Sequence, residues 1–92
     1  MEIEWDPAKA RSNRSKHGIS FSDVEPAFYD EFALSMPDPF SVAEERFLLI
    51  GRSASDRIIT VSFTYRGEGI RIISARSATN AEQQEYEKGV RL

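Results

Sequence analysis

His17 is the only histidine of the chain, and it follows Lys9 and Asn13 at intervals of four residues. Residues four apart lie along one face of a helix, so these three side chains share a face, with Lys16 next to them. An imidazole titrates near neutral pH, which makes His17 a candidate general acid or base for cleaving RNA, where a 2′-hydroxyl attacks the neighbouring phosphorus. The alternative is a histidine that interacts with the dipole at a helix C-terminus and packs locally.

Six arginines and only two acids occur between residues 46 and 76, and Arg71 and Arg76 belong to one expected strand. Arginine suits a phosphodiester because its planar fork donates two parallel hydrogen bonds and does not deprotonate. An odd spacing of five residues places the two arginines on opposite faces of a regular strand, so we expect only one of them to face a common site unless a β-bulge intervenes. The alternative is that these arginines form structural ion pairs with the acidic segment 18–45.

The expected strand over residues 57–66 alternates strictly between two kinds of side chain. The apolar set, which we expect to face the core, is Ile59, Val61, Phe63 and Tyr65. The opposite set is Thr60, Ser62, Thr64 and Arg66. An antiparallel sheet can expose such a row of hydroxyls ending in arginine, either as part of a site or as an ordinary solvated face.

Charge is distributed unevenly along the chain, whose formal net charge is −3. Residues 1–17 carry four basic side chains, all between Lys9 and Lys16, whereas residues 18–45 carry seven acids and neither lysine nor arginine. The net charge argues weakly against a nucleic-acid partner. Contacts with phosphate depend on the local field, however, so an acidic chain with segregated arginines can still bind RNA.

Length and composition limit the possible classes of protein. Ninety-two residues predict one domain, over residues 1–92, and the absence of cysteine excludes disulfides and thiolate chemistry. No run of about 18 apolar residues occurs, and acids stand where a signal peptide has basic residues, so we expect a cytoplasmic protein. Neither a P-loop, a dinucleotide fingerprint, zinc-ligand spacing nor a Ser-His-Asp order is present, and we expect neither cofactor nor metal.

Local patterns predict an α+β fold with the order β-α-α-β-β-β-β-α, in which helices pack on one face of an antiparallel sheet. The expected strands cover residues 2–6, 31–36, 45–52, 57–66 and 70–76, and the expected helices cover residues 7–17, 23–29 and 79–88. The expected inward side chains of the second strand are Phe32, Leu34 and Met36. The expected caps are Asp6 before Pro7 and Gly18 for the first helix, Ser20 or Ser22 for the second, and a Thr79–Glu82 capping box for the last. In the last helix Ala78, Glu82 and Tyr86 share a face, and Tyr86 is expected to dock the helix on the sheet.

Several phrases of the sequence together resemble the BrnT family of bacterial toxins. They are Glu4-Trp5-Asp6-Pro7-Ala8-Lys9, Asn13 with Lys16-His17-Gly18-Ile19 and Phe21, Glu44-Glu45-Arg46-Phe47 with Ile50-Gly51, and Arg71-Ile72-Ile73-Ser74-Ala75-Arg76. The spacing of Ala78, Glu82 and Tyr86 is similar too, so the resemblance covers essentially residues 3–88.

The resemblance implies a RelE-like fold and a ribonuclease that inhibits translation. It also implies neutralisation by a cognate BrnA antitoxin, whose ribbon-helix-helix part would bind operator DNA as a complex with the toxin. RelE-like toxins act without metal, using basic side chains to stabilise a pentavalent phosphate. On this reading Arg71 and Arg76 stabilise the phosphorane and His17 or Glu45 transfers protons. The side chains expected to hold RNA are Lys9, Lys16, Arg46 and Arg66.

Two other functions remain open from the sequence. A non-catalytic interaction module could keep the toxin fold and bind an acidic protein with the same basic surface. A DNA-binding domain is disfavoured, because no helix combines base-reading side chains with a strong apolar face. The acidic segment 18–45 is either a docking site for a basic antitoxin segment or a solvated surface.

Overall fold

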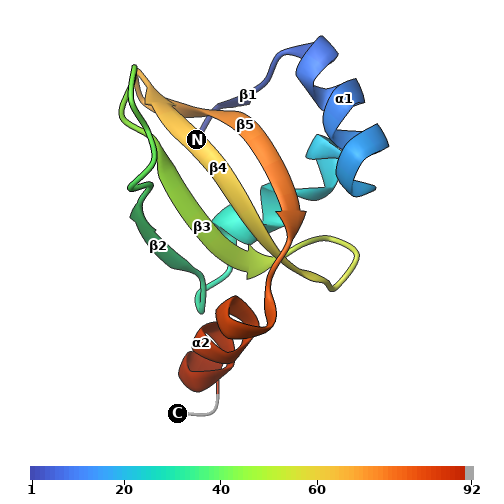
Figure 1. The fold of residues 1–92 in the computed structure, drawn as a ribbon, viewed down its shortest axis with the longest axis vertical. Helices are drawn as coiled ribbons and strands as arrows, with labels where there is room; N and C mark the ends of the chain where they lie inside the picture. The colour runs from blue at the N-terminus through green and yellow to red at the C-terminus, as the bar shows by residue number, and fades with distance from the viewer. Residues whose placement is uncertain (91–92) are drawn as a thin grey trace.

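A computed structural model of the chain describes residues 1–90, so the last two residues of the expected domain lie outside the described part (Figure 1). Its strands form one sheet in the order β1-β5-β4-β3-β2. They are β1 (Ile3–Glu4), β2 (Leu34–Pro37), β3 (Phe47–Arg52), β4 (Ile58–Arg66) and β5 (Gly69–Ser77). The helices are α1 (Pro7–His17), the 3₁₀ helices η1 (Phe21–Asp23) and η2 (Glu25–Tyr29), and α2 (Asn80–Val90).

The ends of α1 follow from local chemistry, as expected. Asp6 Oδ1 accepts a hydrogen bond from the Ala8 N–H at 2.9 Å, and Pro7 occupies the first turn, where its missing N–H costs nothing. Gly18 ends the helix in the left-handed region, with φ of 69°, and its N–H donates to the Arg14 carbonyl. A residue with a Cβ would be strained in this conformation.

The expected second α-helix is instead the pair of 3₁₀ helices η1 and η2. Among the described residues no side chain caps either of them, since the hydroxyls of Ser20 and Ser22 bond each other at 2.9 Å. Pro26 lies at the start of η2 and cannot donate a backbone hydrogen bond, which favours short turns over a continuous α-helix. The buried side of this segment is as predicted, because Val24 and Ala27 are fully enclosed.

The main core lies between the sheet and the segment that contains η1 and η2, drawn in cyan behind the strands (Figure 1). From β4 it receives Ile59, Val61 and Phe63, as the alternation predicts. Tyr65 is 60% exposed, so its assignment to the core is wrong. The tyrosine lies near the end of the strand, and its ring meets those of Phe47 and Phe63 in edge-on contacts.

The sheet is mixed and helices lie on both of its faces, so both parts of the simple antiparallel expectation are wrong. β1 pairs in parallel with β5, whereas the other neighbours are antiparallel. The helix α2 contacts Ile50 and Thr60, whose side chains point away from the main core. Figure 1 shows α2 at the lower end of the sheet. It continues through Gly89 to Val90 instead of ending before the glycine.

The strand β2 begins later than predicted and forms an edge of the sheet. It pairs with β3 from Leu34, opposite Ile50, to Pro37, opposite Phe47. Proline is tolerated on an edge strand because its missing N–H can lie on the side of the strand that has no hydrogen-bonding neighbour. Phe32 precedes the strand and is exposed, as is Met36, so two of the three expected inward positions are wrong.

Candidate functional site

A β-bulge brings Arg71 and Arg76 onto the same face of the sheet. Within the described chain Ile73 has no partner on β4, and the register of β4 and β5 shifts there by one residue. Arg71 lies opposite Thr64 before the shift, and Arg76 lies opposite Thr60 after it. Cross-strand partners share a face, and two residues four apart on β4 share it too. The expectation that only one of these arginines faces a common site is therefore wrong.

We call this surface the open face, defined by Thr60, Ser62, Thr64, Arg71 and Arg76. Thr60 and Thr64 are four positions apart, so the backbones of their arginine partners are roughly 13 Å apart along the strands. Thr60 and Thr64 are both buried, which excludes the alternative of an ordinary solvated row of hydroxyls. Each threonine hydroxyl is covered by a different part of the chain, and these parts define two ends of the open face.

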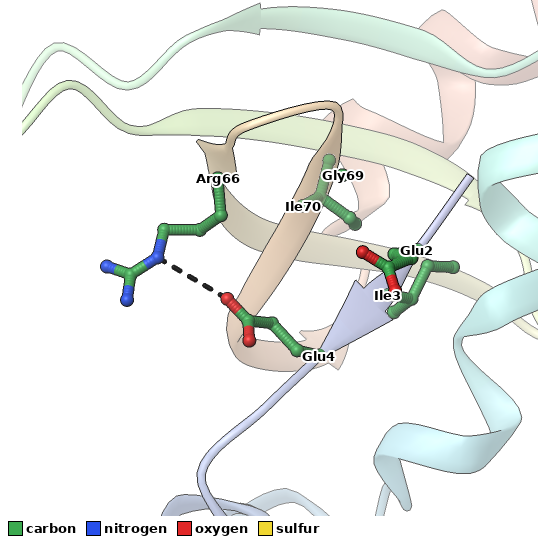
Figure 2. Close-up of a pocket in the computed structure, with 6 residues that line it drawn as sticks. All are labelled: Glu2, Ile3, Glu4, Arg66, Gly69 and Ile70. Atoms are coloured by element: carbon green, nitrogen blue, oxygen red, sulfur yellow. Dashed lines mark ion pairs between the residues drawn. The ribbon is translucent and has the colours of Figure 1, made fainter.

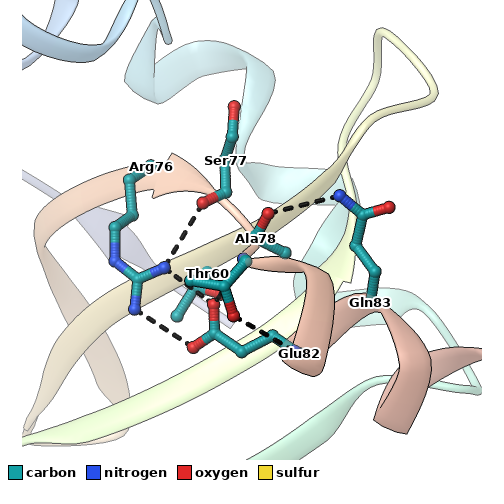
Figure 3. A network of polar contacts seen from close by, with 7 residues as sticks. Thr60, Arg76, Ser77, Ala78, Glu82 and Gln83 are labelled. Carbon is teal, nitrogen blue, oxygen red and sulfur yellow. Dashed lines mark hydrogen bonds and ion pairs between the residues drawn. The ribbon is translucent and has the colours of Figure 1, made fainter.

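At one end, Glu82 of α2 holds Arg76 in a two-pronged ion pair (Figure 3). Arg76 Nη1 donates to Glu82 Oε1 at 2.7 Å, and Nη2 donates to Oε2 at 3.1 Å. The Thr60 hydroxyl and the Thr79 N–H also donate to Oε1, at 3.0 and 2.8 Å. The Thr79 hydroxyl accepts from the Glu82 N–H in return, which confirms the capping box.

This network fixes the charge of both partners. The Arg76 guanidinium first, and then the Thr79 and Thr60 donors, lower the pKa of Glu82 to about 2 despite its partial burial. The Glu82 carboxylate in turn raises the pKa of Arg76. The arginine side chain remains 40% exposed, so part of its hydrogen-bonding fork stays accessible while Glu82 holds the rest.

At the other end, the Glu4 carboxylate pairs with Arg66, as Figure 2 shows, and also lies near the guanidinium group of Arg71. Glu4 Oε1 is 3.4 Å from Arg66 Nε and 3.8 Å from Arg71 Nε. Arg71 Nε is enclosed and has no hydrogen-bond partner within residues 1–90. Glu4 therefore faces two positive charges, while a second acid, Glu2, lies close by. Glu4 and Arg66 also line a pocket of about 310 Å³ at the junction of β1 and β5.

Glu45 and Arg46 lie in the loop before β3, and the backbone of Glu45 contacts the open face. The Thr64 hydroxyl donates to the Glu45 carbonyl at 2.8 Å, while the Glu45 side chain is exposed. Arg46 Nε pairs with Glu44 Oε1 at 3.3 Å. In the described chain this is the one salt bridge between an arginine of segment 46–76 and the acidic segment 18–45, although the charge of Arg52 also acts on Asp30. The alternative of a structural ion network with that segment therefore holds for Arg46 and Arg52, and neither Arg71 nor Arg76 belongs to it.

Two lysines and the histidine of α1 gather beside the bulge. Lys9, Lys16 and His17 line a shallow pocket of about 160 Å³, whose other wall includes Ile73 and Ser74 of β5. The structure therefore places these three residues together, next to the strand that carries both site arginines.

Asn13 shares the helix face of Lys9 and His17, but it has a structural role. Its side-chain amide donates to the Ile19 carbonyl and accepts from the Ala75 N–H, both at 3.0 Å. Because β1 ends at Glu4, the edge of β5 beyond it would otherwise leave the Ala75 N–H unpaired. The sequence did give one indication of this role. The helix α1 has few apolar side chains to bury, so a polar contact is needed to hold it against the rest of the domain.

A second anchor that the sequence did not reveal holds α2. Tyr86 is buried, as predicted, and its hydroxyl donates to Asp30 Oδ2 at 2.7 Å. Asp30 Oδ2 also accepts from the Arg52 N–H at 3.0 Å. Burial raises the pKa of Asp30, but hydrogen bonds from Tyr86 and from two backbone N–H groups lower it on balance. Asp30 thereby ties α2 to both η2 and β3.

The open face offers two guanidinium groups, of which Glu82 holds that of Arg76, and a helix with two lysines and a histidine lies beside it. This is the chemistry of a protein that binds a phosphodiester backbone. Within residues 1–90 no three His, Asp or Glu side chains gather in a group that could hold a metal ion. No helix in that range is long and apolar enough to cross a membrane.

Comparison with known proteins identifies the family. Residues 5–82 match the model of the family described as the ribonuclease toxin BrnT of type II toxin–antitoxin systems. The chain is also similar to the 1.1 Å crystal structure of the Brucella abortus ribonuclease toxin BrnT, with 34% sequence identity and a TM-score of 0.67 over 87% of this chain and 99% of that one. None of the curated protein sequences matches. The chain therefore belongs to the BrnT family, whose members are ribonuclease toxins with RNA as substrate and an antitoxin as partner.

Proposed function

We propose that the open face is the site of RNA cleavage, and that this chain cleaves RNA without a metal ion. The observation that carries the proposal is the bulge at Ile73, because it places Arg71 and Arg76 on one face of the sheet. RNA cleavage of this kind begins when a 2′-hydroxyl attacks the adjacent phosphorus. Negative charge then accumulates on the phosphorane oxygens, where Arg76 and Arg71 stabilise it.

Proton transfer is assigned to His17 or Glu45. One group must take the proton of the attacking 2′-hydroxyl, and another must protonate the departing 5′-oxygen. His17 lies with two lysines beside β5, and the backbone carbonyl of Glu45, whose side chain is exposed, accepts a hydrogen bond from Thr64. Glu82 is unsuited to this role, since a carboxylate with a pKa of about 2 that is bound by Arg76 is a weak proton acceptor. Glu82 acts instead as the positioning residue of Arg76.

RNA binding is assigned to four basic residues around the open face. They are Lys9, Lys16, Arg46 and Arg66. Lys9 and Lys16 flank the bulge, and Arg66 shares Glu4 with Arg71, so they continue the positive surface beyond the two arginines. Their ammonium and guanidinium groups would pair with successive phosphates of a single strand.

The cellular role follows from the family. We assign this chain a RelE-like single domain that acts in the cytoplasm and inhibits translation by cutting RNA. Its antitoxin would be of the BrnA type, with a ribbon-helix-helix part that binds operator DNA while the toxin is attached. A non-catalytic module remains the competing function, and it predicts RNA binding without cleavage.

Cleavage of a labelled RNA by purified protein tests the site. Arg76→Ala is expected to lower the cleavage rate by about 100-fold or more, since each lost donor to a developing oxyanion has that order of effect. Arg76→Lys keeps the positive charge but loses the two-pronged guanidinium group, so its cleavage rate should lie between those of the wild type and Arg76→Ala. Arg57→Ala is the matched control, because Arg57 lines a different pocket with Arg14 and Asp23. Full activity of a folded Arg76→Ala protein would contradict the assignment.

His17→Ala and Glu45→Ala separate the two candidates for proton transfer. The variant that lacks the essential group should lose one limb of the pH–rate profile, whereas loss of a binding residue lowers the rate equally at all pH values. Wild-type protein that binds RNA but leaves it intact would support the non-catalytic module instead.

A further inference from the structure

An apolar groove separates the edge strand β2 from α2. It has a volume of about 350 Å³, and its lining is mostly apolar. The lining residues are Leu34, Met36, Ile50, Ala81, Glu82 and Glu85. Figure 1 places β2 and α2 on the side of the molecule away from α1, so the groove is separate from the basic helix face. The proposed cleavage chemistry uses none of its apolar side chains.

The strand beside the groove is unprotected. Within residues 1–90, β2 pairs with β3 alone, which leaves its outer edge without a partner. Large apolar side chains are also exposed in this part of the chain, namely Phe32, Met36, Phe40 and Val42. An apolar groove next to an open strand edge is typical of a surface that another chain covers.

Both walls of the groove belong to acidic parts of the chain. β2 lies in the middle of segment 18–45, which has seven acids and neither lysine nor arginine. The other wall, α2, carries Glu82, Glu85 and Glu87 against one basic residue, Lys88, over its described length. Of the two that line the groove, Glu82 pairs with Arg76 and Glu85 pairs with the exposed Lys88. The segments that form the groove are still net acidic, which favours a partner whose apolar side chains are flanked by lysine or arginine.

We propose that the groove between β2 and α2 receives a cationic segment of the cognate antitoxin, which places its apolar side chains against Met36 and Ala81. The choice of partner rests on the toxin function, whereas the chemistry of the segment rests on the groove. Glu82 both lines the groove and holds Arg76. A segment bound here contacts the helix that positions the arginine, so neutralisation and docking are linked through one side chain.

Two substitutions in the groove and one outside it test the proposal. Met36→Asp places a charge among the apolar lining, and Glu85→Lys reverses the charge of one wall. Neither residue belongs to the proposed cleavage site. Val42→Asp is the control, because Val42 is 98% exposed and does not line the groove. Affinity for the purified cognate antitoxin is measured by calorimetry, and RNA cleavage is measured with and without that antitoxin.

The proposal expects Met36→Asp to weaken antitoxin binding by about 30-fold or more, the effect of losing a central apolar contact. Glu85→Lys should weaken binding by about 10-fold at low salt, with a smaller effect at high salt. Both variants should cleave RNA at the wild-type rate and escape neutralisation. Antitoxin affinities within about twofold of wild type for both variants would overturn the docking site.

The same measurements separate this proposal from the proposed function. If wild-type protein does not cleave RNA, the function fails, but calorimetry still decides whether the antitoxin binds through the groove. If wild-type protein cleaves RNA and every variant is neutralised normally, the function stands and the groove is not the docking site. Failure of the antitoxin to bind the wild type also overturns the docking proposal.

Discussion

Replacement of Glu82 by glutamine tests the network that holds Arg76. The amide keeps the length of the side chain and can still accept from the Thr79 N–H, so the helix cap survives. What disappears is the negative charge that faces both prongs of the arginine at 2.7 and 3.1 Å. The substitution therefore removes the charge of one carboxylate together with one of its two acceptor oxygens, because the amide NH2 that takes its place only donates.

The size of the effect follows from the pKa of Glu82, which the fold lowers from 4.5 to about 2. Such a change corresponds to about 3 kcal/mol of folding free energy at neutral pH. Water screens part of the pairing, because the Arg76 side chain is 40% exposed. We therefore expect Glu82→Gln to lower the free energy of unfolding by about 2 kcal/mol at pH 7.

The pH dependence has a defined direction. A carboxyl group whose pKa is lowered by folding stabilises the protein above its unfolded pKa, and this stabilisation disappears as the pH falls toward the folded pKa. The difference between wild type and Glu82→Gln should therefore stay constant from pH 7 to about 5 and shrink by roughly half at pH 3. Urea unfolding followed by circular dichroism at each pH measures it.

Glu85→Gln is the matched control, since Glu85 lies on the same helix and pairs only with the exposed Lys88. Its effect should stay below about 0.5 kcal/mol at every pH. A Glu82→Gln difference that is equally large at pH 7 and pH 3 would refute the reasoning, because the loss could not then come from the ionised carboxylate.

Three further outcomes follow from the structure. Gly69→Ala should destabilise the fold by about 2 kcal/mol in urea unfolding, because a Cβ would stand 2.4 Å from the Glu2 carbonyl oxygen and force β1 away from β5; unchanged stability would contradict this close approach. Asn13→Ala should cost about 2 to 3 kcal/mol, since it removes two buried hydrogen bonds, and equal stability would show that water replaces them. Combined replacement of Lys9 and Lys16 by alanine should lower the slope of log affinity against log salt for single-stranded RNA by about 1.4, and an unchanged slope would remove both from the RNA surface.

Sequence patterns predicted the parts of the fold that depend on near neighbours. The Asp6 cap bonds a residue two positions away, and the Thr79–Glu82 box closes over three. Alternation along β4 correctly separated Ile59 and Val61 from Thr60, because successive strand residues point to opposite faces. The ribonuclease activity was predicted from the resemblance to a family, which rests on the order of several motifs. Local patterns alone did not predict this activity.

Pairings between distant segments were predicted poorly. The parallel pairing of β1 with β5 joins Ile3 to Ile70, and no local pattern indicates the direction of a two-residue strand. The anchors Asn13 and Asp30 bond partners as many as 62 and 56 residues away. Each looks like an ordinary surface polar residue until its partner is known.

The candidate site shows the same division. The residue types of the site, arginine for phosphate and histidine for proton transfer, could be read from the sequence, because side-chain chemistry does not depend on the fold. Whether Arg71 and Arg76 share a face was decided by one unpaired residue, Ile73, whose place in the ladder depends on the register of two complete strands. Glu82 became the partner of Arg76 because α2 packs on the open face, and the packing of a helix is set by the surfaces that it meets.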